Sequence, residues 1–211
     1  MLLYMSPVKP PRTRPTRVEV RDRILDAASE VFAAEGFGGA TIDAIGQSVG
    51  FTKGAVYSNF ESKDELFLAL LDRQFELRSE LIATAFDSGG GDTAATAQAL
   101  SRSMLDSIHD ETDYHVLFFE YWLRAVRDPE LRDRLIARRR AAAAQALAIF
   151  EKTATMPHGP QLSGLAQLVV TLTAGIAMEE VLRPGTIHPD LLTQLITAVL
   201  ESASVTGNCD T

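Results

Sequence analysis

The stretch TIDAIGQSVGFTKGAVYSNFESKDELF, residues 41–67, decides how the chain folds. Thr41 is a residue type that caps helix N-termini. The apolar residues after it recur at helical spacing, at Ile42, Ile45 and Val49. Gly50 then interrupts the pattern, and Thr52 is placed to cap a second helix that runs to about Asn59. The stretch therefore predicts two short helices joined by a glycine turn.

Residues 46–50, GQSVG, also fit the G-x-S-x-G pattern of the nucleophile elbow in α/β-hydrolases. An elbow serine stands at the end of a buried parallel strand, whereas Ser48 follows a capped segment with a helical period. A pattern with only three fixed positions also arises often by chance. We therefore predict that Ser48 is not a nucleophile and that the chain is not an enzyme.

The flanking sequence continues the helical pattern. Upstream, apolar residues recur at helical spacing, at Ile24, Leu25, Ala28, Val31 and Phe32. Gly36 then suits the position just after a helix end. Downstream, Ser62 to Glu65 form a capping box that opens a helix over 63–87, roughly 35 Å long at about 1.5 Å per residue. The sequence SGGGD at 88–92 ends that helix.

Helical patterns also fill the second half of the chain. They cover about 93–109, 113–127, 129–154, 161–182 and 188–204. Asp128-Pro129 and His188-Pro189 each combine a cap with proline at the first helical position. No stretch shows the two-residue period of a strand. The predicted fold is all-α with about nine helices, an N-terminal three-helix helix-turn-helix unit followed by a larger C-terminal helical domain.

The predicted organisation has five parts: a disordered basic arm at 1–17, a helix-turn-helix unit at 18–62, a long connecting helix at 63–87, a ligand-binding and dimerisation domain at 88–206, and a tail at 207–211. The basic residues at the start are Lys9, Arg12, Arg14, Arg17, Arg21 and Arg23. The arm is either a solvated tail or a segment that adds phosphate or minor-groove contacts to DNA. Both interpretations stay open.

Composition and charge exclude several classes of protein. The net charge of −8 argues against a general nucleic-acid coat, although residues 1–60 carry 7 Lys/Arg against 6 Asp/Glu. The single cysteine, Cys209, allows neither a disulfide framework nor a thiolate metal cluster. No apolar run approaches the roughly 18 residues that span a bilayer, and the first residues do not form a signal peptide. We predict a cytoplasmic protein with no cofactor, no bound metal and no membrane partner.

Two short helices joined across Val49-Gly50-Phe51 form a helix-turn-helix, whose second helix enters the major groove of DNA. That helix reads TKGAVYSNF, residues 52–60. It offers hydroxyls, an amide, a lysine, and a glycine that lets the backbone approach closely. Val56 and Phe60, one turn apart, are expected to face the protein core. The residues expected to face outward are Thr52, Lys53, Ala55, Tyr57, Ser58 and Asn59.

Residues 41–67 resemble the DNA-binding signature of the TetR family of transcriptional regulators. The threonine that opens the first helix, the turn glycine, the K-G-x-x-Y-x-x-F core and the following S-K-x-E-L match in order. The helix before this stretch and the helical remainder fit the family's layout more loosely. Gly46 departs from the family, in which alanine is usual at this position, at an expected cost of up to about 1 kcal/mol in helix stability.

The resemblance implies a set of DNA contacts. Thr41 and Lys63 are implied phosphate contacts at the starts of their helices. Thr52, Lys53 and Gly54 are implied phosphate and base-edge contacts at the start of the recognition helix. The other implied contacts are Ala55 with a thymine methyl, Tyr57 with the DNA backbone, and Ser58 and Asn59 with phosphates or bases. Lys63→Ala is then expected to weaken binding to all DNA and to flatten its salt dependence.

Several of these residues also have plainer explanations. Thr52 is fully explained as a helix cap, Tyr57 as a packing residue with a solvated tip, and the two lysines as solvated side chains. The segment HDETDYH at 109–115 resembles a metal cluster, but it falls at an interhelical turn where polar residues are expected. The run Arg138-Arg139-Arg140 fits the solvated face of a long helix.

The resemblance also implies a homodimer held by a four-helix interface. The last two helical segments suit this role, since 161–182 is apolar nearly all round and holds small residues that allow close approach. The expected interface residues are Leu165, Leu168, Val169, Leu172, Leu192, Leu195, Ile196 and Val199. A core within one chain explains the same pattern. A dimer also suits DNA binding, because two recognition helices about 34–36 Å apart read a palindrome.

The C-terminal helices of the family bind small molecules, and the resemblance implies an effector here. The residues expected to line its site are Phe75, Met104, Ile108, Phe118, Tyr121, Trp122, Thr171 and Gly175. Ordinary core packing explains each of them as well. The leading hypothesis is a homodimeric repressor that a largely apolar ligand releases from a palindromic double-stranded DNA operator by shifting the helix 63–87. The alternative is a ligand-independent regulator or activator whose C-terminal half only dimerises.

Overall fold

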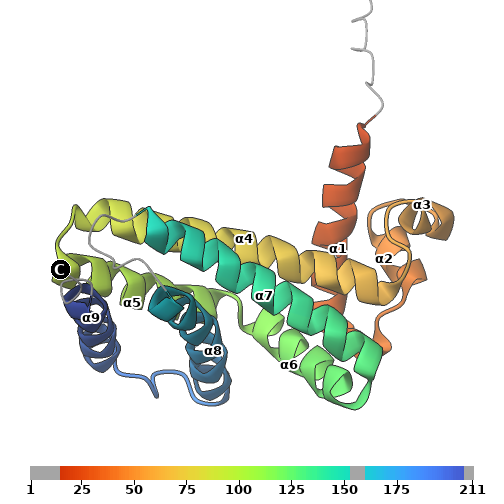
Figure 1. Ribbon diagram of the computed structural model, residues 1–211. Helices are drawn as coiled ribbons and strands as arrows, with labels where there is room; N and C mark the ends of the chain where they lie inside the picture. Colours follow the sequence, from red (N-terminus) through yellow and green to blue (C-terminus); the bar gives the residue numbers. More distant parts are fainter. Residues whose placement is uncertain (1–14, 153–159, 207–211) are drawn as a thin grey trace, which may run out of the picture.

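The computed structural model describes residues 15–152 and 160–206, apart from the side chains at 160, 161, 165 and 202–206. In these ranges the secondary structure is helical throughout (Figure 1). The helices are α1 (Arg17–Gly39), α2 (Ile42–Ser48), α3 (Lys53–Tyr57), α4 (Lys63–Gly89), α5 (Thr93–Asp110), α6 (Thr112–Arg127), α7 (Pro129–Glu151), α8 (Pro160–Leu182) and α9 (Pro189–Thr206). The predicted all-α fold is confirmed, with most helix ends within three residues of prediction.

Side-chain caps fix several of the helix starts. The hydroxyls of Thr41, Thr52 and Ser62 accept hydrogen bonds from backbone N–H groups three residues ahead, at 3.1, 3.2 and 3.0 Å. Asp128 accepts from the N–H groups of the first turn of α7 in the same way. Each bond satisfies a donor that has no partner within its own helix. These four caps agree with the sequence pattern.

The first helix starts earlier than the sequence pattern indicates. Thr16 and Glu19 form a capping box, in which the Thr16 hydroxyl accepts from the Glu19 N–H at 3.2 Å and the Glu19 carboxylate accepts from the Thr16 N–H at 2.7 Å. Arg17 is the first residue of α1. The prediction that residues 15–17 belong to a disordered arm is therefore wrong, whereas 1–14 lie outside the described residues.

Two glycines shape the turn between α2 and α3. Gly50 has φ of 75°, as its place in the turn predicts. Gly46 is buried inside α2, and its carbonyl accepts a hydrogen bond from the Phe51 N–H at 2.8 Å. A Cβ at Gly46 would lie 2.9 Å from the Phe51 carbonyl oxygen. Glycine at 46 thus lets the turn pack closely on α2, a benefit that helix propensity alone did not reveal.

The helix α4 connects the helix-turn-helix unit to the far end of the molecule (Figure 1). Helix α7 lies along α4, and α5 packs against α4 on another side. Helices α8 and α9 pack mainly on α7 and α5 respectively. A change in the position of α4 therefore reaches both halves of the chain.

The buried side chains form two separate clusters. The first joins α1, α2 and α3 to the start of α4, to α6 and to α7. At its centre the rings of Phe67 and Tyr121 stack with centroids 4.1 Å apart, and Phe37 meets both rings edge-on. The second cluster, which includes Phe150 and Leu200, lies at the far end. The predicted boundary at residue 62 is therefore not a boundary in the packing, because α6 shares a core with the helix-turn-helix unit.

Helix α8 is more apolar than the scan for uninterrupted runs suggested. Its residues Leu162–Leu182 have a mean hydropathy of 1.5 over a length that could cross a bilayer, and 24% of the window is buried. Thr171 and Thr173 interrupt the apolar run, but their hydroxyls donate to carbonyls one turn back. One side of the helix packs on α7, α5 and α6. Core helices of folded domains have the same length and composition, so this finding is weak evidence for a membrane span.

Candidate nucleic-acid interface and helical-core cavity

The recognition helix α3 presents most of its side chains to solvent. Thr52, Lys53, Gly54 and Tyr57 are exposed there, and Val56 is buried as expected. Lys53 forms an ion pair with Asp43 of α2 at 3.0 Å, with both side chains about half exposed. A lysine in such an exposed pair can exchange its partner for a phosphate at small cost. Thr41 is also exposed, and its hydroxyl keeps a hydrogen to donate while it caps α2.

The C-terminal end of α3 is less available than the sequence suggests. The Asn59 amide donates to the Ala55 carbonyl at 2.9 Å, and its Oδ1 is buried without a hydrogen bond among the described residues. Ser58 is exposed, but its hydroxyl donates to the same carbonyl at 2.8 Å. Ala55 itself is half-buried. This conformation therefore does not support the implied base contact of Asn59.

Ser48 occupies the last turn of α2. Its hydroxyl donates to the Ile45 carbonyl at 2.9 Å. The residue therefore lies in a helix and not at the end of a strand, as the capped helical pattern predicts.

Two arginines of α1 hold the helix-turn-helix together. Arg21 donates to the Asn59 carbonyl at 3.0 Å, with its guanidinium 4.2 Å from the centre of the Phe60 ring. Arg23 donates to the Val49 carbonyl at 3.2 Å and lies 4.8 Å from the Phe51 ring centre. Sequence reasoning grouped both residues with the basic arm. Their spacing carries no signal that separates a clamp on helix ends from a solvated charge.

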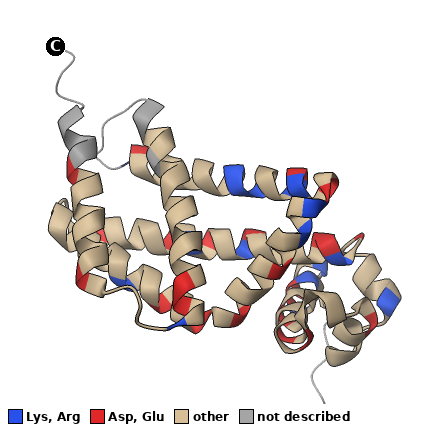
Figure 2. Cartoon of the chain, turned by 90° about the horizontal axis from the view of Figure 1, so that it is seen from below, with Lys and Arg blue, Asp and Glu red and all other residues tan. Residues whose placement is uncertain are grey.

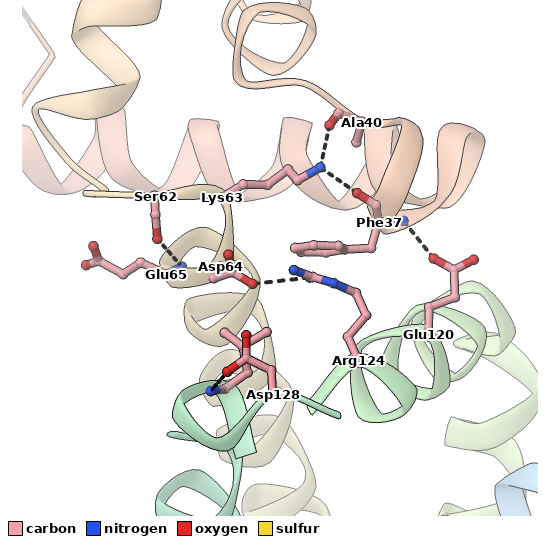
Figure 3. A network of polar contacts seen from close by, with 10 residues as sticks. Phe37, Ala40, Ser62, Lys63, Asp64, Glu65, Glu120, Arg124 and Asp128 are labelled. Atoms are coloured by element: carbon pink, nitrogen blue, oxygen red, sulfur yellow. Dashed lines mark hydrogen bonds and ion pairs between the residues drawn. The ribbon is translucent and has the colours of Figure 1, made fainter. Parts of the chain in front are cut away.

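Lys63 points into the protein at the start of α4 (Figure 3). Its ammonium donates to the carbonyls of Phe37 at 2.7 Å and Ala40 at 2.9 Å, and lies 4.6 Å from the centre of the Phe37 ring. Burial and the nearby Arg124 lower the pKa of Lys63. This geometry gives Lys63 a structural role in place of the free phosphate anchor that the resemblance implied.

The same loop is tied to α6. The Phe37 N–H donates to the Glu120 carboxylate at 2.7 Å, and Arg124 pairs with Asp64 at 3.2 Å (Figure 3). The Arg124 guanidinium also lies 4.3 Å from the Phe37 ring centre. Gly36, with φ of 68°, brings the backbone so close that a Cβ would sit 3.1 Å from the Glu120 oxygens. We name Phe37, Lys63, Asp64, Glu120 and Arg124 the junction network.

A cavity of about 170 Å³ lies among α4 to α9. Four residues expected to line a ligand site do line it, namely Phe75, Met104, Ile108 and Phe118. The other residues of its wall include Leu100, Phe150, Leu168, Val169, Leu172, Leu192, Leu195, Ile196, Val199 and Leu200. The wall is mainly apolar, which is typical of sites for small organic molecules.

The other four expected residues lie elsewhere. Tyr121 is 0% exposed within the first core cluster, and Trp122 is 44% exposed. Thr171 and Gly175 are exposed residues of α8 and are not part of the cavity wall. The reason is geometric: successive residues of a helix point about 100° apart, so neighbours of Phe118 in sequence face other surroundings. Their assignment to the ligand site is corrected.

The polar part of the wall contains a neutral histidine. His115 is 3% exposed, and its Nε2 lies 3.2 Å from a guanidinium nitrogen of Arg78. A guanidinium can only donate, so Nε2 is the acceptor and the ring carries no charge. Burial, with a smaller contribution from Arg78, lowers the pKa of His115 to about 3.

His115→Gln is expected to make the protein less sensitive to mild acid. The folded chain holds His115 neutral with a pKa of about 3, against 6.5 ordinarily. Between these values the unfolded chain binds a proton that the folded chain does not, so stability falls as pH drops below about 6.5, by about 1.4 kcal/mol per pH unit. From pH 7 to 5 the parent should lose about 2 kcal/mol more unfolding free energy than the variant.

Urea denaturation at the two pH values measures this difference. The exposed His188 provides a control, since His188→Gln should leave the acid sensitivity of the parent unchanged. Equal losses in the parent and in His115→Gln would contradict the neutral state of His115.

An exposed apolar stripe runs along α8 and α9. On α8 it comprises Gly164, Leu168, Thr171, Gly175, Met178 and Leu182, at spacings of three and four residues. On α9 it comprises Leu191, Leu195 and Ala198. Both helices are almost free of charged residues along these stretches (Figure 2). Such a stripe covers one face of each helix, as in helix pairs that pack against partners.

The predicted dimer residues divide between this stripe and the interior. Leu168, Leu172 and Leu195 are exposed, whereas Leu192 is 4% exposed and faces the core. Val169, Ile196 and Val199 are partly buried and line the cavity. Leu165 lies outside the described side chains. The prediction of an interface at Leu192 is corrected, because its side chain already packs within its own chain.

The histidines of the segment 109–115 face different partners. His109 Nε2 lies 2.7 Å from the carboxylate of Glu180 on α8, while His115 contacts Arg78. Glu180 is 1% exposed and also accepts from the N–H groups of Gly185 and Ile187 in the loop before α9. The segment therefore links α5 to α8 and does not gather its side chains at one point.

Comparisons with known proteins agree with this architecture. Residues 24–70 match the family model described as bacterial regulatory proteins, tetR family, and residues 91–202 match the tetracyclin repressor-like C-terminal domain. The crystal structure of a TetR-family regulator from Mesorhizobium loti shares the fold with a TM-score of 0.64 at 18% identity, covering 91% of this chain and 98% of that one.

Two curated relatives differ in how much of the chain they match. The HTH-type transcriptional regulator SrpR of Pseudomonas putida is 40% identical over 92 residues, 43% of this chain and 40% of that protein. The HTH-type regulator in the dhlA 5'region of Xanthobacter autotrophicus is 27% identical over 190 residues, 89% of this chain and 92% of that protein. The match thus spans less than half of SrpR. Because the two family models cover both halves of it, this chain belongs to the TetR family of DNA-binding transcriptional regulators, which are not enzymes.

Proposed function

We propose that the chain is a cytoplasmic, homodimeric repressor that a small molecule releases from a palindromic operator. The observation that carries this proposal is the shared use of α4 and α6. Both helices line the cavity, through residues such as Phe75 and Phe118, and both belong to the junction network that holds the helix-turn-helix unit. A molecule that binds one arrangement of these helices more tightly shifts the population toward that arrangement.

The proposed transmission runs along α6. Phe118 faces the cavity, whereas Glu120 and Arg124, within two turns on the same helix, contact Phe37 and Asp64 of the DNA-binding unit. A ligand that moves α6 or α4 would therefore carry the helix-turn-helix with it. In a dimer, this movement changes the distance between the two recognition helices, and a spacing away from about 34–36 Å no longer fits successive major grooves.

The proposed DNA contacts come from the exposed part of the helix-turn-helix. They are Thr41, Thr52, Lys53, Gly54, Tyr57 and Ser58. Hydroxyls and a lysine at helix starts suit phosphate oxygens, and Gly54 has open space where a side chain would project. One helix of five residues reads few base pairs, so a second copy is required for a specific site.

The exposed stripe of α8 and α9 supports the second copy. Leu182 and Leu191 are 78% and 64% exposed, and Gly164 and Gly175 would let a facing helix approach closely. Two such faces placed around a twofold axis form a four-helix interface with the same patch on each subunit. Burial of these leucines by a partner removes apolar surface from water.

Met178→Glu is expected to convert the protein to a monomer and to abolish operator binding at concentrations where the parent binds. Met178 is 47% exposed on the stripe, so a carboxylate there would be buried against its copy without a partner. Leu123→Glu is the control, because Leu123 is 54% exposed on α6, away from the stripe. Sedimentation velocity reports the oligomeric state, and selection from random duplex DNA reports the operator.

The outcomes separate the parts of the proposal. A palindromic motif selected by the parent, lost in Met178→Glu and kept in Leu123→Glu, supports it. A dimeric Met178→Glu protein would refute the interface, and selection of no motif would refute specific DNA recognition. A transcription assay on the selected site distinguishes repression from activation.

A further inference from the structure

The wall of the cavity carries positive charge without a matching negative charge. Two arginines line it, Arg78 from α4 and Arg139 from α7, and its lining residues include no Asp or Glu within the described ranges. A charge in an apolar wall is costly unless a partner of opposite sign or a set of hydrogen bonds compensates it. The partners of each arginine therefore indicate what the cavity can accept.

Arg78 has its compensation within the protein. Its guanidinium pairs with Glu111 at 3.5 Å and donates toward His115 Nε2 at 3.2 Å. Glu111 also accepts from the Ser107 hydroxyl at 3.4 Å, behind the wall. Since His115 is neutral, this group of residues has no net charge.

Arg139 lacks such compensation. Its contacts in the described part of the chain are the Val170 carbonyl at 3.4 Å and the Phe118 ring, 5.9 Å from its centre. Its neighbours in sequence differ, since Arg138 pairs with Asp72 at 3.2 Å and Arg140 is exposed. The prediction that the whole arginine run is a solvated face is therefore wrong for Arg139, which is half-buried and faces the cavity.

A second polar group of the wall is also unsatisfied. The Tyr114 hydroxyl is buried and makes no hydrogen bond to any described residue. Burial raises the pKa of Tyr114, so the group stays an O–H donor at neutral pH. Away from this polar part, the wall is formed by apolar residues such as Leu100, Phe150 and Leu200.

We propose that the cavity binds an amphipathic monoanion whose carboxylate pairs with Arg139 and accepts a hydrogen bond from Tyr114, while its apolar tail lies toward Phe150 and Leu200. This inference rests on the proposed function of the cavity as an effector site. The size suits a tail of medium length or a single aromatic ring, since cavities of about 150 Å³ accept benzene. An arginine forks onto a carboxylate with two hydrogen bonds, which a neutral amide cannot match.

Calorimetric titration of the full chain with matched pairs of ligands tests the charge. The pairs are decanoate with decanamide and 4-phenylbutyrate with 4-phenylbutyramide, which differ only at the head group. At least one acid should bind about tenfold or more tightly than its amide, because a hydrogen bond to a charged group contributes about 1.5–3 kcal/mol. Arg139→Met should remove this preference, Tyr114→Phe should reduce it severalfold, and Arg140→Met should keep it.

Arg139→Lys keeps a positive charge and should retain part of the preference, which separates loss of charge from loss of fold. Equal binding of acids and amides, parent-like binding of the acids by Arg139→Met, or failure of every acid to bind would each overturn the proposal. Operator binding is measured separately on the same samples. An acid that binds as expected without releasing operator DNA would refute the proposed regulation and leave the anion site intact.

Discussion

Glu180→Leu is expected to lower the free energy of unfolding by about 3–5 kcal/mol. The Glu180 carboxylate accepts from the Gly185 N–H at 2.8 Å and the Ile187 N–H at 2.6 Å, and its Oε2 lies 2.7 Å from His109 Nε2. Because the side chain is fully buried, leucine would leave these groups without acceptors and without water. The loop between α8 and α9 would lose the contact that sets the two helices relative to each other.

Urea denaturation at fixed protein concentration measures the effect, since dimerisation makes stability depend on concentration. Glu179→Leu is the matched control: Glu179 is the exposed neighbour in sequence, and its replacement should change stability by less than about 0.5 kcal/mol. Equal effects of the two substitutions would contradict the role of Glu180. Its hydrogen bonds lower the pKa of Glu180, so its contribution is present above the ordinary value of 4.5 and is lost as pH falls through the folded value.

Lys63→Met is expected to destabilise the junction by about 1–3 kcal/mol and to weaken operator binding without changing its salt dependence. The substitution keeps the length of the side chain but leaves the Phe37 and Ala40 carbonyls without the donor that now satisfies them. Loss of a phosphate contact would instead lower the slope of log affinity against log salt by about 0.9.

Lys53→Met provides the comparison, because Lys53 is exposed on the recognition helix and its charge is free to meet DNA. It should lower the salt slope by about 0.9 and leave the unfolding free energy nearly unchanged. Fluorescence anisotropy of a labelled operator over a range of salt concentrations distinguishes the two lysines. A reduced slope for Lys63→Met would restore the phosphate contact that the family resemblance implies.

The sequence predicted the parts of this fold that local chemistry determines. Thr41, Thr52, Ser62 and Asp128 cap their helices because a side-chain oxygen and the following N–H groups meet whatever lies around them. Gly50 has its positive φ for an equally local reason. Helix bounds and fold class followed from such signals and from the spacing of apolar residues.

Predictions failed where the direction of a side chain depends on distant elements. Phe118 and Tyr121 are both buried aromatic residues of α6, yet one lines the cavity and the other packs on Phe67. The sequence could not distinguish Arg139 from Arg138 and Arg140, because only the positions of α4 and α8 determine which guanidinium meets a carboxylate. The same holds for Lys63, whose acceptors lie more than 20 residues upstream.

The shared core of α6 and the helix-turn-helix unit bears on how such regulators can be recombined. A hybrid that joins residues 1–62 of another protein to this sensor half would place foreign side chains against Tyr121, Glu120 and Arg124. The new loop would need a residue able to adopt the backbone of Gly36 beside Glu120, and an aromatic ring to fill the place of Phe37. The exchangeable unit is therefore the helix-turn-helix together with the facing side of α6, and crossover points chosen at the start of α4 divide it.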